Sequence, residues 1–156
     1  MNIFKEYLTT KHGILVIEAD DEAILSINFL PAGKNPDENA QSNIFTELCV
    51  MQLREYFAGD RRFFNFPYRL NGTDFQNEVW SEIAKIPYGE TISYKELAER
   101  INKPQAIRAV AAAASENKLL ITIPCHRVIG TDGSLIGFSA GLKIKEQLLE
   151  LECSCR

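Results

Sequence analysis

The sequence predicts an α+β protein in two parts, a small amino-terminal antiparallel sheet with a helix and then a mostly helical carboxy-terminal region. Strand-like alternation of apolar and polar residues is confined to the first part of the chain, whereas helical spacing dominates after residue 72. The 156 residues, of which 46% are hydrophobic and 24% charged, have the composition of an ordinary globular protein that can bury a proper core.

Residues 5–30 read KEYLTTKHGILVIEADDEAILSINFL, in which β-branched or aromatic residues alternate with polar ones. Breaks at His12-Gly13 and at Asp20-Asp21 divide this segment, so the pattern predicts a small antiparallel meander. A polar loop follows. We then expect a helix up to Gly59, because apolar residues recur at helical spacing: Ile44, Leu48, Met51, Leu53 and Tyr56.

Residues 61–72, RRFFNFPYRLNG, resemble an extended strand and a linker, and Thr73 opens a new helix. In the sequence TDFQ the threonine can cap the helix while Gln76 reaches back, which is a capping box. We therefore expect a domain boundary near residue 71, with domains at 1–70 and 72–156.

Two helices joined by a tight turn form a candidate helix-turn-helix in the second domain. After a helix that ends before Pro87, a second capping box at Ser93 and Glu96 opens a helix in SYKELAERI. A short turn then places Pro104 at a first helical position, ahead of QAIRAVAAAASEN. Small side chains fill the stretch from Ala109 to Ala114, which suits close packing inside the domain or against a nucleic-acid groove, and composition leaves both open.

The net charge of −4 lacks the basic excess typical of nucleic-acid binding, so a DNA-binding protein would have to gather its basic residues on one face. No apolar run approaches the length of a membrane span and no signal segment opens the chain, which predicts a cytoplasmic protein without membrane contact. The four cysteines are expected to be reduced, and with only two histidines no metal site is predicted.

Cys125 and His126 stand side by side in ITIPCHRVIG, which raises the question of nucleophilic chemistry. Only the thiolate is a good nucleophile, and a thiol of ordinary pKa is a few per cent ionised at neutral pH. If both residues lay on one extended strand their side chains would point opposite ways, so contact would need a bend or a bridging water.

The last helix supplies a third group. In SAGLKIKEQLLELE the apolar face runs through Ile144, Leu148 and Leu151, and helical spacing sets Glu152 beside Leu148 on that face. A carboxylate there needs a cation or a donor, and His126 is the natural partner. The result is an acid, a base and a nucleophile in series. The alternative is a cysteine that is simply a buried apolar residue and a Glu152 at a solvated chain end.

The octet IPCHRVIG resembles the active-site signature of the O6-alkylguanine-DNA alkyltransferases, also called methylated-DNA-protein-cysteine methyltransferases. The likeness extends through GTDFQNEVW, IPYGETISYKELA, RAVAAA and GLKIKEQLLELE, and less specifically through LREYFAGDRRFF. It implies an RNase H-like first domain and a winged helix-turn-helix in the second. It also implies irreversible transfer of the alkyl group of O6-alkylguanine or O4-alkylthymine in double-stranded DNA to Cys125, once per protein, by a monomer without cofactor or metal.

The resemblance also implies a role for each site residue. His126 takes the thiol proton through a water, Glu152 orients His126, Tyr94 gives a proton to the base and Asn117 braces the active-site turn. Arg108 enters the stack in place of a flipped nucleotide, because a buried thiol cannot reach a stacked base. The DNA-binding set implied for the minor groove is Ser93, Tyr94, Arg108, Ala109, Ala112 and Ala113. The pocket around the base is formed by Arg127, Val128, Phe138 and Ser139.

Two departures from the family pattern concern the DNA side of the site. Asn117 is followed by Lys118 where the family usually has proline, and Glu116 would face phosphate.

Two other functions compete with alkyl transfer. An alkyltransferase-like lesion sensor would replace the acceptor cysteine, which is present here. A thiol hydrolase would need an oxyanion hole, and no glycine-rich donor loop precedes Cys125.

Overall fold

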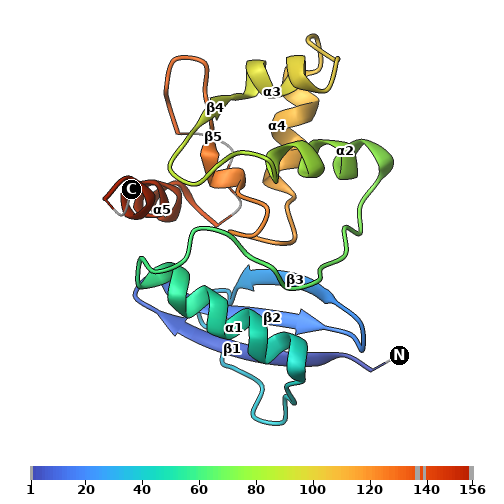
Figure 1. The fold of residues 1–156 in the computed structure, drawn as a ribbon, viewed down its shortest axis with the longest axis vertical. Helices are drawn as coiled ribbons and strands as arrows, with labels where there is room; N and C mark the ends of the chain where they lie inside the picture. Colours follow the sequence, from blue (N-terminus) through green and yellow to red (C-terminus); the bar gives the residue numbers. More distant parts are fainter. Residues whose placement is uncertain (1, 136–137, 139, 155–156) are drawn as a thin grey trace. The chain divides into compact units, whose positions relative to one another are not determined.

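The protein is described here by a computed structural model that covers residues 2–135, 138 and 140–154. The chain forms two compact units that divide between Arg69 and Leu70 (Figure 1). Each unit has its own core.

The first unit is a three-stranded antiparallel sheet with one helix across it. The strands β1 (Phe4–Thr10), β2 (Gly13–Ala19) and β3 (Ile24–Phe29) pair in the order β1-β2-β3, and α1 (Ile44–Phe57) packs on the sheet (Figure 1). Alternate residues of β2, namely Leu15, Ile17 and Ala19, are fully buried, as the period-two pattern of a half-buried strand requires. The predicted meander is confirmed.

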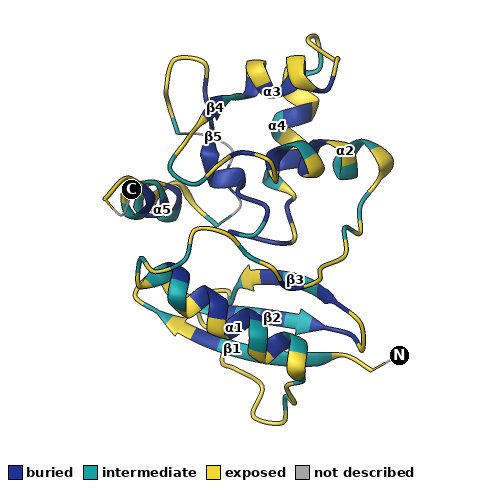
Figure 2. Ribbon diagram, in the orientation of Figure 1, coloured by how far each residue is buried: buried dark blue, intermediate teal, exposed yellow. Residues whose placement is uncertain are grey.

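The buried face of α1 differs from the predicted one. Ile44 and Met51 are 73% and 49% exposed. The face that packs on the sheet starts at Thr46, the third residue of the helix, which forms the capping box with Asn43. It continues through Cys49, Val50, Leu53 and Tyr56. Figure 2 shows this buried face beside an exposed one along the same helix. At 3.6 residues per turn, Ile44 and Met51 fall on the opposite side of the helix from this face, toward solvent.

The prediction of an extended strand in residues 61–72 is wrong. The segment makes a single bridge, between Tyr68 and Ile24, and is otherwise irregular. The amide side chain of buried Gln52 bonds both the side chain and the backbone N–H of Asn65, which replaces a strand ladder. Pro67 has no N–H to donate and contributes only its carbonyl, to Ile24.

The second unit is mostly helical. It contains α2 (Asp74–Ile83), α3 (Tyr94–Arg100), α4 (Ile107–Ser115) and α5 (Leu142–Ser154), and two short parallel strands, β4 (Ile92–Ser93) and β5 (Val128–Ile129). α2 and α3 both pack on α4, and the indole N–H of buried Trp80 on α2 donates to the Ala113 carbonyl of α4 at 2.8 Å. The helix-turn-helix pair is α3 and α4.

The helix starts follow the capping predictions in part. The Thr73 and Gln76 box of α2 is confirmed in both directions. At α3 the Ser93 hydroxyl accepts the Glu96 N–H at 3.0 Å, but the Glu96 carboxylate pairs with Arg100 one turn later. Pro104 was expected at a first helical position and instead lies in the turn, because α4 begins only at Ile107.

Candidate active site

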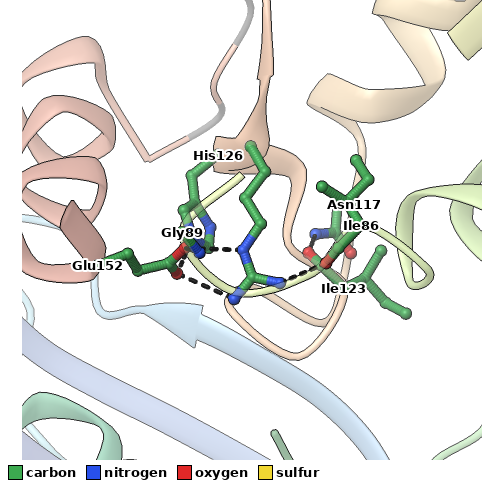
Figure 3. Close-up of polar contacts among 7 residues, drawn as sticks. Ile86, Gly89, Asn117, Ile123, His126 and Glu152 are labelled. Carbon is green, nitrogen blue, oxygen red and sulfur yellow. Dashed lines mark hydrogen bonds and ion pairs between the residues drawn. The ribbon is translucent and has the colours of Figure 1, made fainter. Parts of the chain in front are cut away.

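A single amide side chain closes the turn that carries Cys125. Asn117 Nδ2 donates to the Ile123 carbonyl at 2.7 Å and to Cys125 Sγ at 3.1 Å, and its Oδ1 accepts the Leu119 N–H at 2.9 Å. Asn117 is shown beside Ile123 in Figure 3. Asn117 follows directly on the end of α4, so the helix positions the donor that faces the sulfur.

The same turn contains a strained residue. Ile121 has a φ of 71°, in the left-handed region that β-branched side chains strongly disfavour. Such a conformation costs roughly 1–3 kcal/mol and persists only where the surroundings enforce it. The two Asn117 bonds at Leu119 and Ile123 span the strained residue, so they hold this conformation in place.

Cys125 opens a 3₁₀ turn, Cys125–Arg127 (η1), rather than lying on an extended strand. The strand geometry that set His126 opposite Cys125 therefore does not apply, since a 3₁₀ turn separates neighbouring side chains by about 120°. The thiol is buried, and burial raises its pKa to about 11, against the Asn117 hydrogen bond and the Lys145 charge, which lower it. The resting group is a protonated thiol with a donor already in place.

His126 and Glu152 form the pair that helical spacing predicted. His126 Nε2 lies 2.5 Å from Glu152 Oε2, and both side chains are buried (Figure 3). Burial lowers the pKa of His126, and Glu152 acts in the opposite direction. Among the described residues the other ring nitrogen, Nδ1, has no hydrogen-bond partner although it is buried.

Glu152 is also the centre of a wider network. Arg127 donates to it through Nε at 2.8 Å and Nη2 at 3.0 Å, and the Gly89 N–H donates at 3.1 Å. Gly89 has a φ of 79° in a turn closed by the Glu90 N–H and the Pro87 carbonyl, which suits glycine at this position. Burial alone would raise the pKa of Glu152, but His126 and Arg127 outweigh burial and bring it well below its usual range.

Arg127 was predicted to line the substrate pocket, and the structure gives it another partner set. Its third nitrogen, Nη1, donates to the Ile86 carbonyl at 2.6 Å, so all three side-chain nitrogens bond protein groups. The guanidinium is buried and lies 5.7 Å from the centroid of the Tyr88 ring. Arg127 therefore ties the loop after α2 to Glu152.

Lys145 was missed by the sequence analysis. It lies on α5, is fully buried, and donates from Nζ to the Val128 carbonyl at 2.5 Å and to Tyr94 Oη at 3.5 Å. Burial lowers its pKa to about 8, and burial with the negative charge of Cys125 raises the pKa of Tyr94 to about 12. The available signal was its spacing: residues 145, 148 and 152 share one face of the helix.

The exposed face of α4 carries three of the six residues expected to meet DNA. Arg108, Ala109 and Ala112 are exposed, but Ala113 is buried and its carbonyl holds Trp80, so its assignment to the groove-facing set is wrong. The Glu116 carboxylate accepts a bond from Gln76 at 2.5 Å.

The other residues of the implied pocket and DNA-binding sets differ in exposure. Val128 and Phe138 are buried, Ser93 is half-buried, and Ser139 lies outside the described residues. The part of the chain that the structure describes holds no cluster of histidine, cysteine and acidic side chains able to bind a metal ion. It likewise contains no helix with the length and apolar character to span a membrane.

Comparisons with known proteins agree over both units. Residues 3–70 match the family model for the 6-O-methylguanine DNA methyltransferase, ribonuclease-like domain, and residues 74–154 match the model for its DNA binding domain. The methylated-DNA–protein-cysteine methyltransferase of Methanosarcina acetivorans is 42% identical over 146 residues, which cover 92% of this chain and 94% of that protein. The inducible enzyme of Bacillus subtilis is 49% identical over 106 residues, which cover 68% of this chain and 59% of that enzyme.

Solved structures show the same likeness. The O6-methylguanine methyltransferase of Mycobacterium tuberculosis superposes with a TM-score of 0.89 at 36% identity, over 99% of this chain and 95% of that one. The same organism's protein in complex with DNA gives a TM-score of 0.87 at 37% identity, over 97% and 94% of the two chains. The predicted fold, a small sheet unit followed by a helical unit, is confirmed.

Proposed function

Because the chain belongs to the methylated-DNA–protein-cysteine methyltransferase family, we propose that it repairs DNA by irreversible transfer of an alkyl group from O6-alkylguanine, or O4-alkylthymine, to Cys125. The observation that carries this assignment is the turn around Cys125. Its buried thiol receives a hydrogen bond from Asn117 and is adjacent in the chain to the His126 and Glu152 pair. No cofactor or metal takes part.

The proton of the thiol goes to His126. Glu152 is ionised, since its pKa is depressed, and accepts the hydrogen on Nε2 of His126. That bond selects the neutral tautomer with a free electron pair on Nδ1, which is the buried nitrogen able to take the thiol proton, directly or through one water. Asn117 then donates to the thiolate that forms.

The thiolate attacks the alkyl carbon. A sulfur–carbon bond forms, the bond from that carbon to O6 breaks, and the electron pair leaves with the guanine, which takes a proton. Tyr94 is the proposed donor, because its raised pKa keeps the phenol protonated until the base becomes an anion. The thioether product has no leaving group that water can displace, so each protein acts once.

The target nucleotide has to leave the DNA stack, because Cys125 is only 1% exposed. We assign the space left in the duplex to Arg108, which is exposed on α4 beside Ala109 and Ala112, whose small side chains allow the helix to approach a groove closely. The proposed working form is a monomer bound to alkylated double-stranded DNA in the cytoplasm.

The test is an intact-protein mass spectrum after incubation with a duplex that carries one O6-methylguanine, followed by peptide mapping. We expect a gain of one methyl group that saturates at one per protein and maps to Cys125. Cys125→Ala should abolish the gain and leave DNA binding nearly intact, whereas Cys49→Ala should retain it. Tight binding without methyl transfer would instead make the protein a lesion sensor, and methylation at Cys153 would undo the choice of acceptor.

A second experiment tests base flipping. Arg108→Ala should slow repair of a methylated duplex far more than reaction with free O6-benzylguanine, which needs no flipping. Arg100→Ala is the matched control. Arg100 is also an exposed arginine of the α3 and α4 pair, but its guanidinium is paired with the Glu96 carboxylate. Equal losses of rate on the duplex and on the free base would remove Arg108 from the flipping step.

A further inference from the structure

The residue before the nucleophile is the centre of a tight three-residue turn. Pro124 has a φ of −79° and a ψ of 63°, and the Cys125 N–H donates across it to the Ile123 carbonyl at 2.7 Å. These angles and this bond define an inverse γ-turn, whose central residue typically has φ about −75° and ψ about +65°. Pro124 and Cys125 are both buried, so the turn belongs to the interior of the second unit.

The Ile123 carbonyl at the start of this turn accepts two donors. One is the Cys125 N–H, and the other is Asn117 Nδ2 at 2.7 Å (Figure 3). The same Nδ2 also donates to Cys125 Sγ at 3.1 Å. The backbone and the side chain of Cys125 are therefore held to one carbonyl, directly through the N–H and indirectly through Asn117. A thiol held in this way gives up its rotational freedom before the substrate arrives.

Pro124 also opens the turn that follows. Its carbonyl accepts the Arg127 N–H at 2.8 Å, which closes the 3₁₀ turn η1 that contains His126. The ψ angle of Pro124 thus relates the segment that carries Cys125 and His126 to Asn117 on the other side of the turn. A rotation about this bond would separate the Cys125 sulfur from the amide that donates to it.

Proline suits this position for three physical reasons. Its ring fixes φ at about −65 ± 15°, a range that includes the value in this turn. It has no N–H, so the buried turn needs no acceptor at residue 124. It also disfavours the helical conformation for the residue before it, Ile123. The 3₁₀ turn therefore does not extend backwards, which would direct the Ile123 carbonyl to His126 and away from Cys125.

We propose that Pro124 is a positioning residue for alkyl transfer, an inference that rests on the function proposed above. It holds residues 123–125 in the inverse γ-turn and thereby keeps the Cys125 sulfur against Asn117 and in line with the alkyl carbon of the bound base. Pro124 acts through the backbone of Cys125 and not by contact with the substrate.

The position of the sulfur matters because the reaction is a displacement at carbon. Attack requires the sulfur, the alkyl carbon and O6 to lie nearly in line, and a misplacement of about 1 Å can slow a reaction about a hundredfold. Cys125 is buried, so the base has to come to the sulfur and the sulfur has to be in place when it arrives. A turn with restricted backbone angles meets this requirement.

The experiment compares Pro124→Ala with Pro124→Gly, and Pro36→Ala is the matched control. Both substitutions at residue 124 remove the ring and add one N–H, and they differ in backbone freedom, which is larger for glycine. Pro36 is an exposed proline in a loop of the first unit. The kinetic readouts are the rate of methyl transfer at saturating methylated duplex, the rate with free O6-benzylguanine and the Kd for the duplex. The structural readouts are the melting temperature and the hydrogen exchange of the Cys125 amide measured by NMR.

We expect Pro124→Ala to slow transfer from the duplex and from the free base by the same factor, about tenfold, and Pro124→Gly to slow both further. The Kd for the duplex should keep its wild-type value, because Pro124 is buried and contributes no DNA-facing side chain. The Cys125 amide should exchange faster in both variants, and the melting temperature should fall by a few degrees. Pro36→Ala should match the wild type in every rate.

A purely structural role for Pro124 predicts a different result. It would lower the melting temperature, but the folded protein, assayed well below that temperature, would transfer the methyl group at the wild-type rate. Wild-type rates in both folded variants, or equal slowing in Pro36→Ala, would overturn the inference and leave the alkyl-transfer function intact. Failure of the wild type to gain a methyl group would instead overturn the function, whatever the Cys125 amide shows.

The wild type decides the question if neither Pro124 variant folds. Slow exchange of the Cys125 amide supports a turn in which this N–H is bonded to the Ile123 carbonyl. Exchange as fast as that of an unstructured peptide would contradict the turn, and with it the role of Pro124.

Discussion

Cys49 and Cys125 are both buried thiols, one in each unit, yet their surroundings differ. Cys49 lies on the buried face of α1, where burial raises its pKa beyond that of an ordinary thiol and the negative charge of Glu6 raises it further. Cys125 is equally buried, but the Asn117 hydrogen bond and the Lys145 charge oppose the effect of burial. Burial alone makes a cysteine inert, and the donors and charges aimed at the sulfur make it a candidate nucleophile.

The same contrast holds for the other buried polar groups. In the first unit Thr46 completes a helix cap, Gln52 holds an irregular segment and Asp20 closes a turn through the N–H groups of residues 22 and 23. In the second unit the buried polar side chains of the described residues instead converge on one place, the turn at residues 125–128: Asn117, His126, Arg127, Lys145 and Glu152. Several buried ionisable side chains gathered at one turn mark the functional site, whereas a single buried carboxylate that caps a turn does not.

The largest expected effect on the transfer rate comes from a comparison of two buried amide side chains, Asn117 and Gln52. Asn117→Ala should remove about 2–4 kcal/mol of stability, because it leaves the Ile123 carbonyl and the Leu119 N–H without their partner. It should also slow methyl transfer about ten- to hundredfold, since a hydrogen bond to a charged acceptor is worth roughly 1.5–3 kcal/mol. Urea unfolding and single-turnover kinetics give the two quantities.

Gln52→Ala is the control for the loss of a buried amide. It removes the bonds to Asn65 and should reduce stability by about 1–3 kcal/mol without changing the rate of transfer. If the two variants slowed transfer to the same extent, the rate would depend on overall stability, and the distinction between the units would fail.

A second comparison concerns two buried carboxylates, Glu152 and Asp20. Glu152→Gln keeps the shape but replaces a charged acceptor of His126, Arg127 and Gly89 by a neutral amide. We expect transfer to slow about tenfold, because the tautomer and the cation of His126 lose their support, with a stability loss of roughly 1–3 kcal/mol.

Asp20→Asn should instead lower stability and leave the rate unchanged, because Asp20 bonds the N–H groups of a turn and pairs with Arg69. An unchanged rate in Glu152→Gln would reduce that carboxylate to a structural partner of Arg127. Rates of both variants with free O6-benzylguanine, normalised to the folded fraction, decide the question.

The pairing of His126 with Glu152 could be predicted because it depends on local regularity. Helical spacing in α5 sets Glu152 on the face of Leu148, and a carboxylate there needs a partner. The Thr73 cap of α2 was predictable for the same reason, since a capping box is a short-range pattern.

Arg127 and Lys145 could not be assigned in this way. Both residues carry charges that usually face solvent, and only the packing of the loop at Gly89 and of β5 against α5 shows where those charges lie. Ala113 was misplaced because an alanine-rich helix has no polar face from which its rotation can be read, and the left-handed Ile121 has no sequence signature at all. Non-local contacts decide all four positions.

Lowering the pH is expected to have the smallest effect of these tests. It distinguishes the stability of the two units without a mutation. Folding lowers the pKa of His126 below its ordinary value of 6.5, so between pH 6.5 and the lower folded value the unfolded chain binds a proton that the folded chain does not. Stability of the second unit therefore falls as the pH drops from 7 to 5, and Glu152 adds to the loss only below about 4.5. In the first unit the depressed pKa of Asp20 takes effect only below about 3.8.

The single tryptophan, Trp80, is buried in the second unit, so its fluorescence during thermal unfolding reports that unit alone. Hydrogen exchange of peptides from β2 reports the first. Between pH 7 and pH 5 we expect the midpoint of the Trp80 transition to fall by several degrees, since about 1 kcal/mol moves the melting temperature of a domain this size by roughly 4–8 °C. Exchange in β2 should change only by the intrinsic pH dependence of the amides. Equal destabilisation of both units at pH 5 would mean that His126 is not held neutral by burial, and the electrostatic picture of the site would have to be revised.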